Sequence, residues 1–184
     1  MTRRVPLLSG TRLLAIDAPG EAVVLRPPPP GIGIVDVGAA VREALSFPLS
    51  GPALEQLVTR GGRATVVVEP PALPIPSSSR DPREAAIEAT VDELTRLGVD
   101  QARQTLLVAS GLHRRPGRAE LGELVAPEFA RRFRGRVEVH DASDPGLVTA
   151  NEHGSAPVRV HPALTETDLL VVVSAAETVL HGGP

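Results

Sequence analysis

The chain has 184 residues and a mass of 19.2 kDa, which suits one domain or one and a half. Hydrophobic residues make up 42% and charged residues 22%, values typical of a folded globular protein, so extensive disorder is excluded. The net charge of −3 and the presence of only three aromatic residues, all Phe, argue against a nucleic-acid partner, which needs a basic surface or stacking rings.

Two residue types are missing altogether. The absence of Cys excludes disulfides, zinc–thiolate sites and Cys nucleophiles, and the absence of Lys excludes a Walker A lysine and a Schiff-base lysine. No apolar run approaches the roughly 18 residues of a membrane span. The apolar run near the N-terminus is too short for a signal peptide. The sequence therefore predicts a cytoplasmic protein without a membrane partner.

Residues 1–37 are expected to form an N-terminal extension of short strands followed by a Pro-rich linker. The strands are predicted at residues 13–16 and 23–25, and the tetraproline at 27–30 cannot continue a central strand. Two helices are expected next, at 39–45 and 52–59, the second capped by Gly61 and Gly62.

From residue 63 onward, continuous apolar runs alternate with helical patterns. The runs predict strands at residues 64–68, 105–109, 137–140, 158–160 and 169–173. A helix is expected from Asp81 as N-cap and Pro82 as first helical residue to a stop at Gly98, and one or two helices at 118–134 break near Pro127. This alternation predicts an α/β domain over residues 38–184, with a mostly parallel sheet and helices on both faces.

In such a sheet, ligands bind at the carboxyl ends of the strands, so chemistry is expected in the segments that follow them. The segment at 110–116 (SGLHRRP) places His113 between Gly111 and two Arg residues. An imidazole titrates near neutral pH and suits proton transfer beside an anion. The alternative is a solvated loop histidine.

Two further segments are candidates. The Pro-rich loop before the helix at 81 could cradle a phosphate, with Ser77 and Ser78 as donors, or its serines could merely cap that helix. The cluster at 140–144 (HDASD) could hold a metal or act in acid–base chemistry, or could be a turn with side-chain caps. The five His residues form no recognisable zinc motif.

Taken in order, these segments resemble the N-terminal domain of the nickel-dependent lactate racemase family. The segment 109–114 (ASGLHR), with Glu120 and Leu121 seven and eight residues after His113, matches the family's His-bearing motif. The segment 73–76 (LPIP) stands where the family has Arg-Pro-Val-Pro, and 166–170 (ETDLL) matches its Glu-Ala-Asp-Leu-Leu. The early stretch 41–57 also fits, so the resemblance covers about residues 38 to 184.

The resemblance implies a racemase that acts on a 2-hydroxy acid through hydride transfer to a nickel-pincer nucleotide. Two His residues would alternate as base and acid. His113 matches one of them by motif, and His181 is the only His after the strand at 169–173, where the second is expected. The loop residues Pro74, Ser77 and Ser78 would lie beside the phosphate of the cofactor.

The chain also departs from the family pattern. Pro70 and Leu73 stand where the family's cofactor loop carries Asp and Arg, and the family's Lys tether and nickel-ligand His have no counterpart. The chain ends soon after its last predicted strand, so we expect either a C-terminal domain or partner chain, or a free tail. Two alternatives therefore stay open: a non-catalytic module that binds an anionic small molecule or a partner chain, and a structural fragment that needs a missing half.

Overall fold

The computed structural model describes residues 2–9, 12–24, 32–69, 81–111, 116–117, 121–122, 124–150 and 157–174. Its centre is a four-stranded parallel sheet in the order β5-β4-β3-β8. The strands are β3 (Ala64–Val68), β4 (Gln104–Val108), β5 (Arg136–Val139) and β8 (Leu169–Val173). The predicted α/β class and parallel sheet are therefore confirmed.

The two central strands are buried because a neighbour lies on each side. β3 pairs with β4 and with β8 in parallel register, which sets Val66 level with Leu106 and with Val171. All five residues of β4 are buried, including the polar Gln104, which lies just before the run predicted at 105–109. β8 differs, since it is an edge strand whose outer residues Leu170 and Val172 are 47% and 60% exposed. A continuous apolar run is typical of a buried strand, and β8 departs from that pattern, since its residues alternate between more buried and more exposed.

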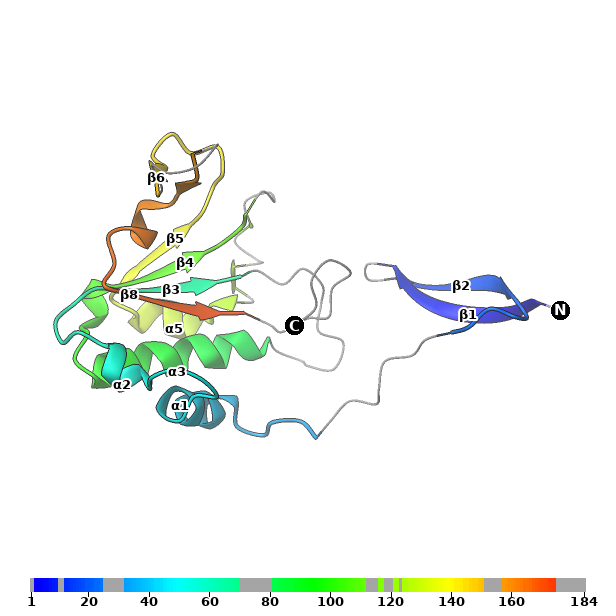
Figure 1. Cartoon of the computed structure of the whole chain (residues 1–184), viewed down its shortest axis with the longest axis horizontal. Coiled ribbons are helices and arrows are strands. Elements are labelled where there is room, and N and C mark those ends of the chain that lie inside the picture. The colour runs from blue at the N-terminus through cyan, green and yellow to red at the C-terminus, as the bar shows by residue number, and fades with distance from the viewer. Residues whose placement is uncertain are drawn as a thin grey trace.

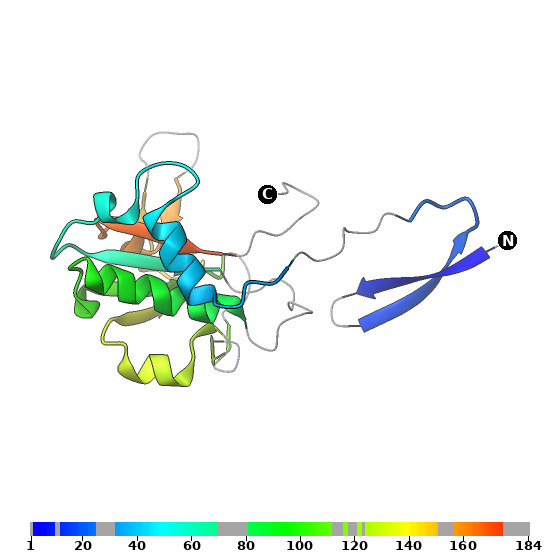
Figure 2. The ribbon, with the colours of Figure 1, turned by 90° about the horizontal axis from the view of Figure 1, so that it is seen from below.

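The helices lie against one face of the sheet (Figures 1 and 2). They are α1 (Val37–Ser46), α3 (Pro82–Arg96) and α5 (Pro127–Arg132). The core forms between these helices and the inner face of the strands. It includes these residues among its most buried: Val66, Val68, Ile87, Val91, Leu94, Leu106, Val108, Leu124 and Phe129.

The opposite face has a different cover. It carries the 3₁₀ turn η2 (Pro162–Leu164), from which the Ala163 carbonyl accepts a hydrogen bond from Thr65 Oγ1 at 2.8 Å. The short antiparallel ladder of β6 (Val148–Thr149) and β7 (Arg159–Val160) precedes it. Helices on both faces were expected, but the described part of the β5-to-β8 connection contains no α-helix. A right-handed crossover that returns past β3 must run over this second face, and here a ladder and a 3₁₀ turn occupy it.

Local signals set the ends of α1 and α3. Asp36 caps α1 by accepting a hydrogen bond from the Ala39 N–H at 2.8 Å. Asp81 caps α3, Pro82 is its first residue, and Gly98 follows its end with φ of +99°, a left-handed conformation that favours glycine. The start and stop predicted for this helix are confirmed.

The segment between α1 and β3 departs from the prediction. The helix α2 (Leu54–Leu57) is one turn long, because Val58 already has the extended backbone that ends it. Gly61 is therefore not its C-cap; it turns the chain with φ of +74° and donates its N–H to the carbonyl of Gly98 at 2.9 Å. The remaining short element is the 3₁₀ turn η1 (Gln101–Arg103), just before β4.

An antiparallel hairpin precedes this α/β body. It consists of β1 (Thr2–Ser9) and β2 (Arg12–Pro19), with Val5 opposite Ile16, and it stands apart from the sheet in both views (Figures 1 and 2). No strand was predicted over residues 2–9. The strand β1 contains Pro6, which a two-stranded ladder tolerates since one side of each strand is unpaired. The strand expected at 23–25 is wrong: residues 22–24 are irregular after a turn, and residues 25–31 lie outside the described residues.

Candidate functional site

The carboxyl ends of the four parallel strands form one edge of the sheet. The ladder continues for one residue beyond the strands, which fixes where each following segment starts. Three backbone hydrogen bonds do this: Glu69 N–H to the Val173 carbonyl at 3.4 Å, Ala109 N–H to Val68 at 2.8 Å, and His140 N–H to Val108 at 2.9 Å. The segments that follow β8, β3, β4 and β5 therefore begin side by side at this edge.

The strand order reverses between β3 and β8. From β3 the chain moves to β4 and β5 in one direction, and then returns to place β8 on the other side of β3. In open parallel sheets, such a reversal leaves a crevice outside the carboxyl ends, where ligands bind. The segments leaving the two strands at this reversal are residues 70–80 and 175–184.

The site residues predicted from the sequence are His113, His181, Pro74, Ser77 and Ser78. All five lie outside the described residues, as do residues 70–80 and 112–115, so their roles stay predictions. The structure does describe the residues from which these segments start.

Ser110 and Gly111 carry the segment of His113. Ser110 is 4% exposed, and its hydroxyl has no hydrogen-bond partner among the described residues. Gly111 has φ of +56°, and a Cβ built there would meet nothing within 4 Å. A buried polar group without a partner is uncommon and available to a ligand, and a glycine in open space permits close approach to the backbone.

The neighbouring strand ends in a second buried polar atom of this kind. Nδ1 of His140 is buried and has no hydrogen-bond partner among the residues described. The rest of the cluster predicted at 140–144 is a turn: Asp141 Oδ1 accepts from the N–H and the hydroxyl of Ser143 at 2.9 and 2.6 Å, and Asp144 Oδ1 accepts from the Gly146 N–H at 2.7 Å. Of the two interpretations of this cluster, the capped turn is the one the structure supports.

Arg83 ties together the two ends of the Pro-rich loop. Its Nη1 donates to the carbonyl of Glu69 at 2.8 Å, and its Nη2 and Nε donate to the carboxylate of Asp81 at 2.6 and 2.9 Å. The two side chains are 5% and 11% exposed. This link was not predicted, although its signal is in the sequence as an Arg placed two residues after the N-cap Asp.

The electrostatics of this pair keep Asp81 ionised. Burial acts to raise its pKa, but the hydrogen bonds and the charge of Arg83 outweigh burial, so the pKa of Asp81 lies below its usual value. The same carboxylate accepts the Arg83 backbone N–H at 2.9 Å and so serves one free donor at the start of α3. The start of α3 and the end of β3 are thereby held at a fixed separation beneath the loop.

Within the described ranges, no group of three or more His, Asp or Glu side chains is arranged to hold a metal ion. No described helix is long and apolar enough to cross a bilayer.

An open parallel sheet with a strand-order reversal and helices packed on it defines an α/β domain. The comparison with protein families makes this more specific. The model of the lactate racemase N-terminal domain matches residues 10–181, and the chain belongs to this family.

A solved structure supports the fold. The chain is similar to the lactate racemase apoprotein from Thermoanaerobacterium thermosaccharolyticum, with a TM-score of 0.62 and 19% sequence identity. The match covers 92% of this chain and 38% of that one, so the chain spans well under half of the solved protein. No curated protein matches the chain.

Proposed function

We propose that this chain is the N-terminal domain of a racemase-type isomerase that acts on a 2-hydroxy acid, with its site at the carboxyl edge of the sheet. The observation that carries the proposal is the adjacency of β4, β3 and β8. The segment of His113 follows β4, the Pro-rich loop follows β3, and the segment of His181 follows β8. Three segments far apart in the sequence thus start from neighbouring strands.

In this proposal His113 moves the hydroxyl proton of the substrate. A 2-hydroxy acid carries a carboxylate next to the reacting carbon, and Arg114 and Arg115 directly after His113 provide charges that would attract it. The imidazole accepts the hydroxyl proton of the substrate and can later return it, whereas the hydride at C2 would need an acceptor that the residues of this chain do not supply. His181, on the segment after β8, would serve the second enantiomer in the same way.

The residues of this chain do not by themselves fit the family's nickel-pincer nucleotide. Hydroxyls of Ser77 and Ser78, beside Pro74, suit a phosphate group. The chain contains no Lys to which the cofactor could be tethered, and the described residues form no group of metal ligands. We therefore assign binding and proton movement to this chain, and we derive no step through the cofactor.

The test is a chiral assay of the protein as its own cell produces it. Enantiopure L-lactate serves as the probe, and its conversion to D-lactate is followed by chiral chromatography. We expect His113→Ala to lower turnover by about 10²-fold or more, the range of a lost general acid–base, while lactate still binds. The matched control is His153→Ala, which removes a His that the proposal does not use.

Two outcomes would overturn the proposal. If His113→Ala racemises lactate as fast as the unchanged protein, the assignment of His113 is wrong. If the unchanged protein binds lactate but never racemises it, the chain is a binding module for anionic small molecules instead.

A further inference from the structure

A second site lies at the opposite, amino edge of the sheet. An Arg stands at the start of each of three neighbouring strands: Arg63 directly precedes β3, Arg103 directly precedes β4, and Arg136 opens β5. Because parallel strands begin at the same edge, three guanidinium groups that are far apart in the sequence gather there.

The strands add two hydroxyls on the same face. Thr65 in β3 and Thr105 in β4 follow Arg63 and Arg103 by two residues, and all four side chains line the same hollow. The register sets Thr65 level with Thr105, and Thr105 level with Arg136. These two threonines and the three Arg residues thus form a patch on the face that the α-helices leave uncovered.

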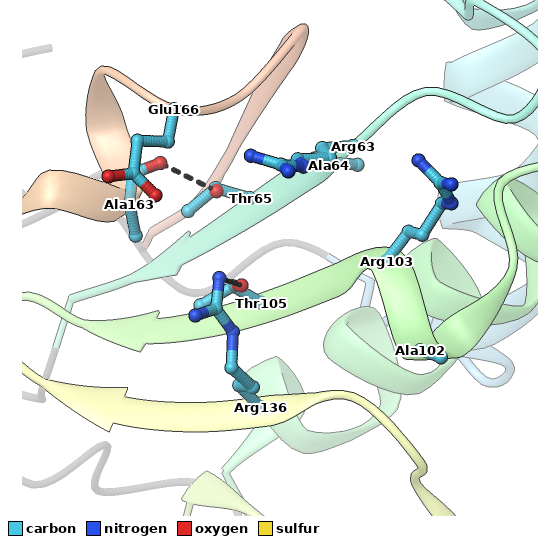
Figure 3. Close-up of a pocket in the computed structure, with 9 residues that line it drawn as sticks. All are labelled: Arg63, Ala64, Thr65, Ala102, Arg103, Thr105, Arg136, Ala163 and Glu166. Carbon is cyan, nitrogen blue, oxygen red and sulfur yellow. Dashed lines mark hydrogen bonds between the residues drawn. The ribbon is translucent and has the colours of Figure 1, made fainter.

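This patch is hollow. The space above it has a volume of about 420 Å³ and is bounded on the far side by Ala163 and Glu166 (Figure 3). Thr65 and Thr105 form its floor and are 2% and 4% exposed. The Thr65 hydroxyl is already used, since it donates to the Ala163 carbonyl at 2.8 Å.

Several donors around the hollow have no hydrogen-bond or ion-pair partner among the residues that the structure describes. Arg136 donates to Thr105 Oγ1 at 3.3 Å and has Glu138 3.6 Å away. Arg63 and Arg103, in contrast, make no ion pair with any described residue. In the hydrogen bond with Arg136, the hydroxyl oxygen of Thr105 is the acceptor. Among the described residues, no group accepts the hydrogen of this hydroxyl. Two free guanidiniums and one buried hydroxyl are a donor set for an anion.

We propose that this hollow binds a small phosphorylated molecule. A guanidinium presents paired donors that match phosphate oxygens, and three guanidiniums face the hollow against one carboxylate, Glu166, on its rim. The volume exceeds that of one phosphate and leaves room for a second phosphate or a small polar group. Among the described residues, no aromatic or large apolar side chain lines the hollow, which disfavours a nucleobase or an acyl chain. Glu166 would accept a hydroxyl of the ligand.

The test measures binding of inorganic pyrophosphate to the 184-residue chain by isothermal titration calorimetry at low and at physiological salt. We expect a Kd below about 1 mM at low salt, which weakens as salt rises. Arg63→Ala and Arg103→Ala should each raise the Kd about tenfold, as expected for the loss of one charged hydrogen bond. The matched control, Arg131→Ala, removes an exposed Arg from α5 and should leave the Kd unchanged.

Melting curves followed by circular dichroism show whether each variant folds. If only one of the two Arg variants folds, that variant alone tests the proposal. Equal affinity of all variants would overturn the proposal, since it would mean diffuse attraction to a basic surface. Absence of binding up to about 10 mM pyrophosphate at low salt would also overturn it. Citrate, a polycarboxylate of similar charge, should bind at least tenfold more weakly, and equal affinity would contradict the choice of phosphate.

Discussion

The link between Arg83 and Asp81 gives the sharpest stability prediction. Arg83→Met keeps most of the side-chain volume but removes the guanidinium that bridges Asp81 and the carbonyl of Glu69. The Asp81 carboxylate, 11% exposed, then stays buried without its cation. Breaking a buried ion pair in this way costs about 3–5 kcal/mol, a large part of the roughly 5–15 kcal/mol that stabilises a typical domain.

The pH dependence of this loss has a definite sign. In the unchanged protein the lowered pKa of Asp81 contributes stability that is present above its unfolded pKa and is lost as the pH falls through the folded value. In Arg83→Met the hydrogen bonds and charge of the guanidinium are lost, and only the hydrogen bond from the backbone N–H of residue 83 still opposes burial, so the pKa of Asp81 is higher than in the unchanged protein and the ionised carboxylate destabilises the fold at neutral pH. The stability difference between the two proteins should therefore be largest near pH 7 and shrink below about pH 4.

Urea unfolding followed by circular dichroism at several pH values measures this difference. The matched control is Arg4→Met, which breaks a pair with Asp17 whose side chains are 81% and 67% exposed, and it should change the free energy of unfolding by under about 0.5 kcal/mol. The reasoning is refuted if Arg83→Met costs under about 1 kcal/mol, or if its cost does not change between pH 7 and pH 4.

Two further predictions concern packing, both measured by urea unfolding. Leu106→Ala, at a fully buried position of β4, should cost about 3–5 kcal/mol, whereas Leu170→Ala on the exposed side of β8 should cost under about 1 kcal/mol; equal costs would contradict the exposure of Leu170. Gly135→Ala should destabilise by more than about 2 kcal/mol, because its Cβ would lie 2.7 Å from the carbonyl oxygen of Gln101. Gly122→Ala, in helical backbone with nothing within 4 Å of the new Cβ, should instead stabilise by about 0.5–1 kcal/mol.

Strands and helices were predictable where one local signal dominates. The apolar runs at 64–68 and 169–173 coincide with β3 and β8, because a central sheet needs continuous β-branched segments. Asp81 and Gly98 delimit α3 because a cap and a left-handed glycine act within one turn. Other elements were missed or mispredicted: no strand was predicted at β1, and α2 ends at Val58, one turn after it begins, whereas a helix over 52–59 was predicted.

The arrangement of the strands was harder to predict, since it depends on contacts between distant residues. The sequence does not show that β8 pairs with β3, and it is this pairing that exposes Leu170 and Val172 and places the reversal. The prediction of a site at the carboxyl edge of the sheet follows from the alternation of strands and helices. The hollow at the amino edge does not, because the Arg residues gather only once β3, β4 and β5 are neighbours.

The position of ligand binding is the central claim, and amide chemical shifts measure it most directly. L-lactate is titrated into the ¹⁵N-labelled chain, and the shifted amides are mapped onto the sheet. We expect the amide chemical shifts of Glu69, Ser110, Gly111 and Ser174 to change, because these residues follow β3, β4 and β8. Shifts confined to the amino edge, or none at millimolar lactate, would contradict this claim.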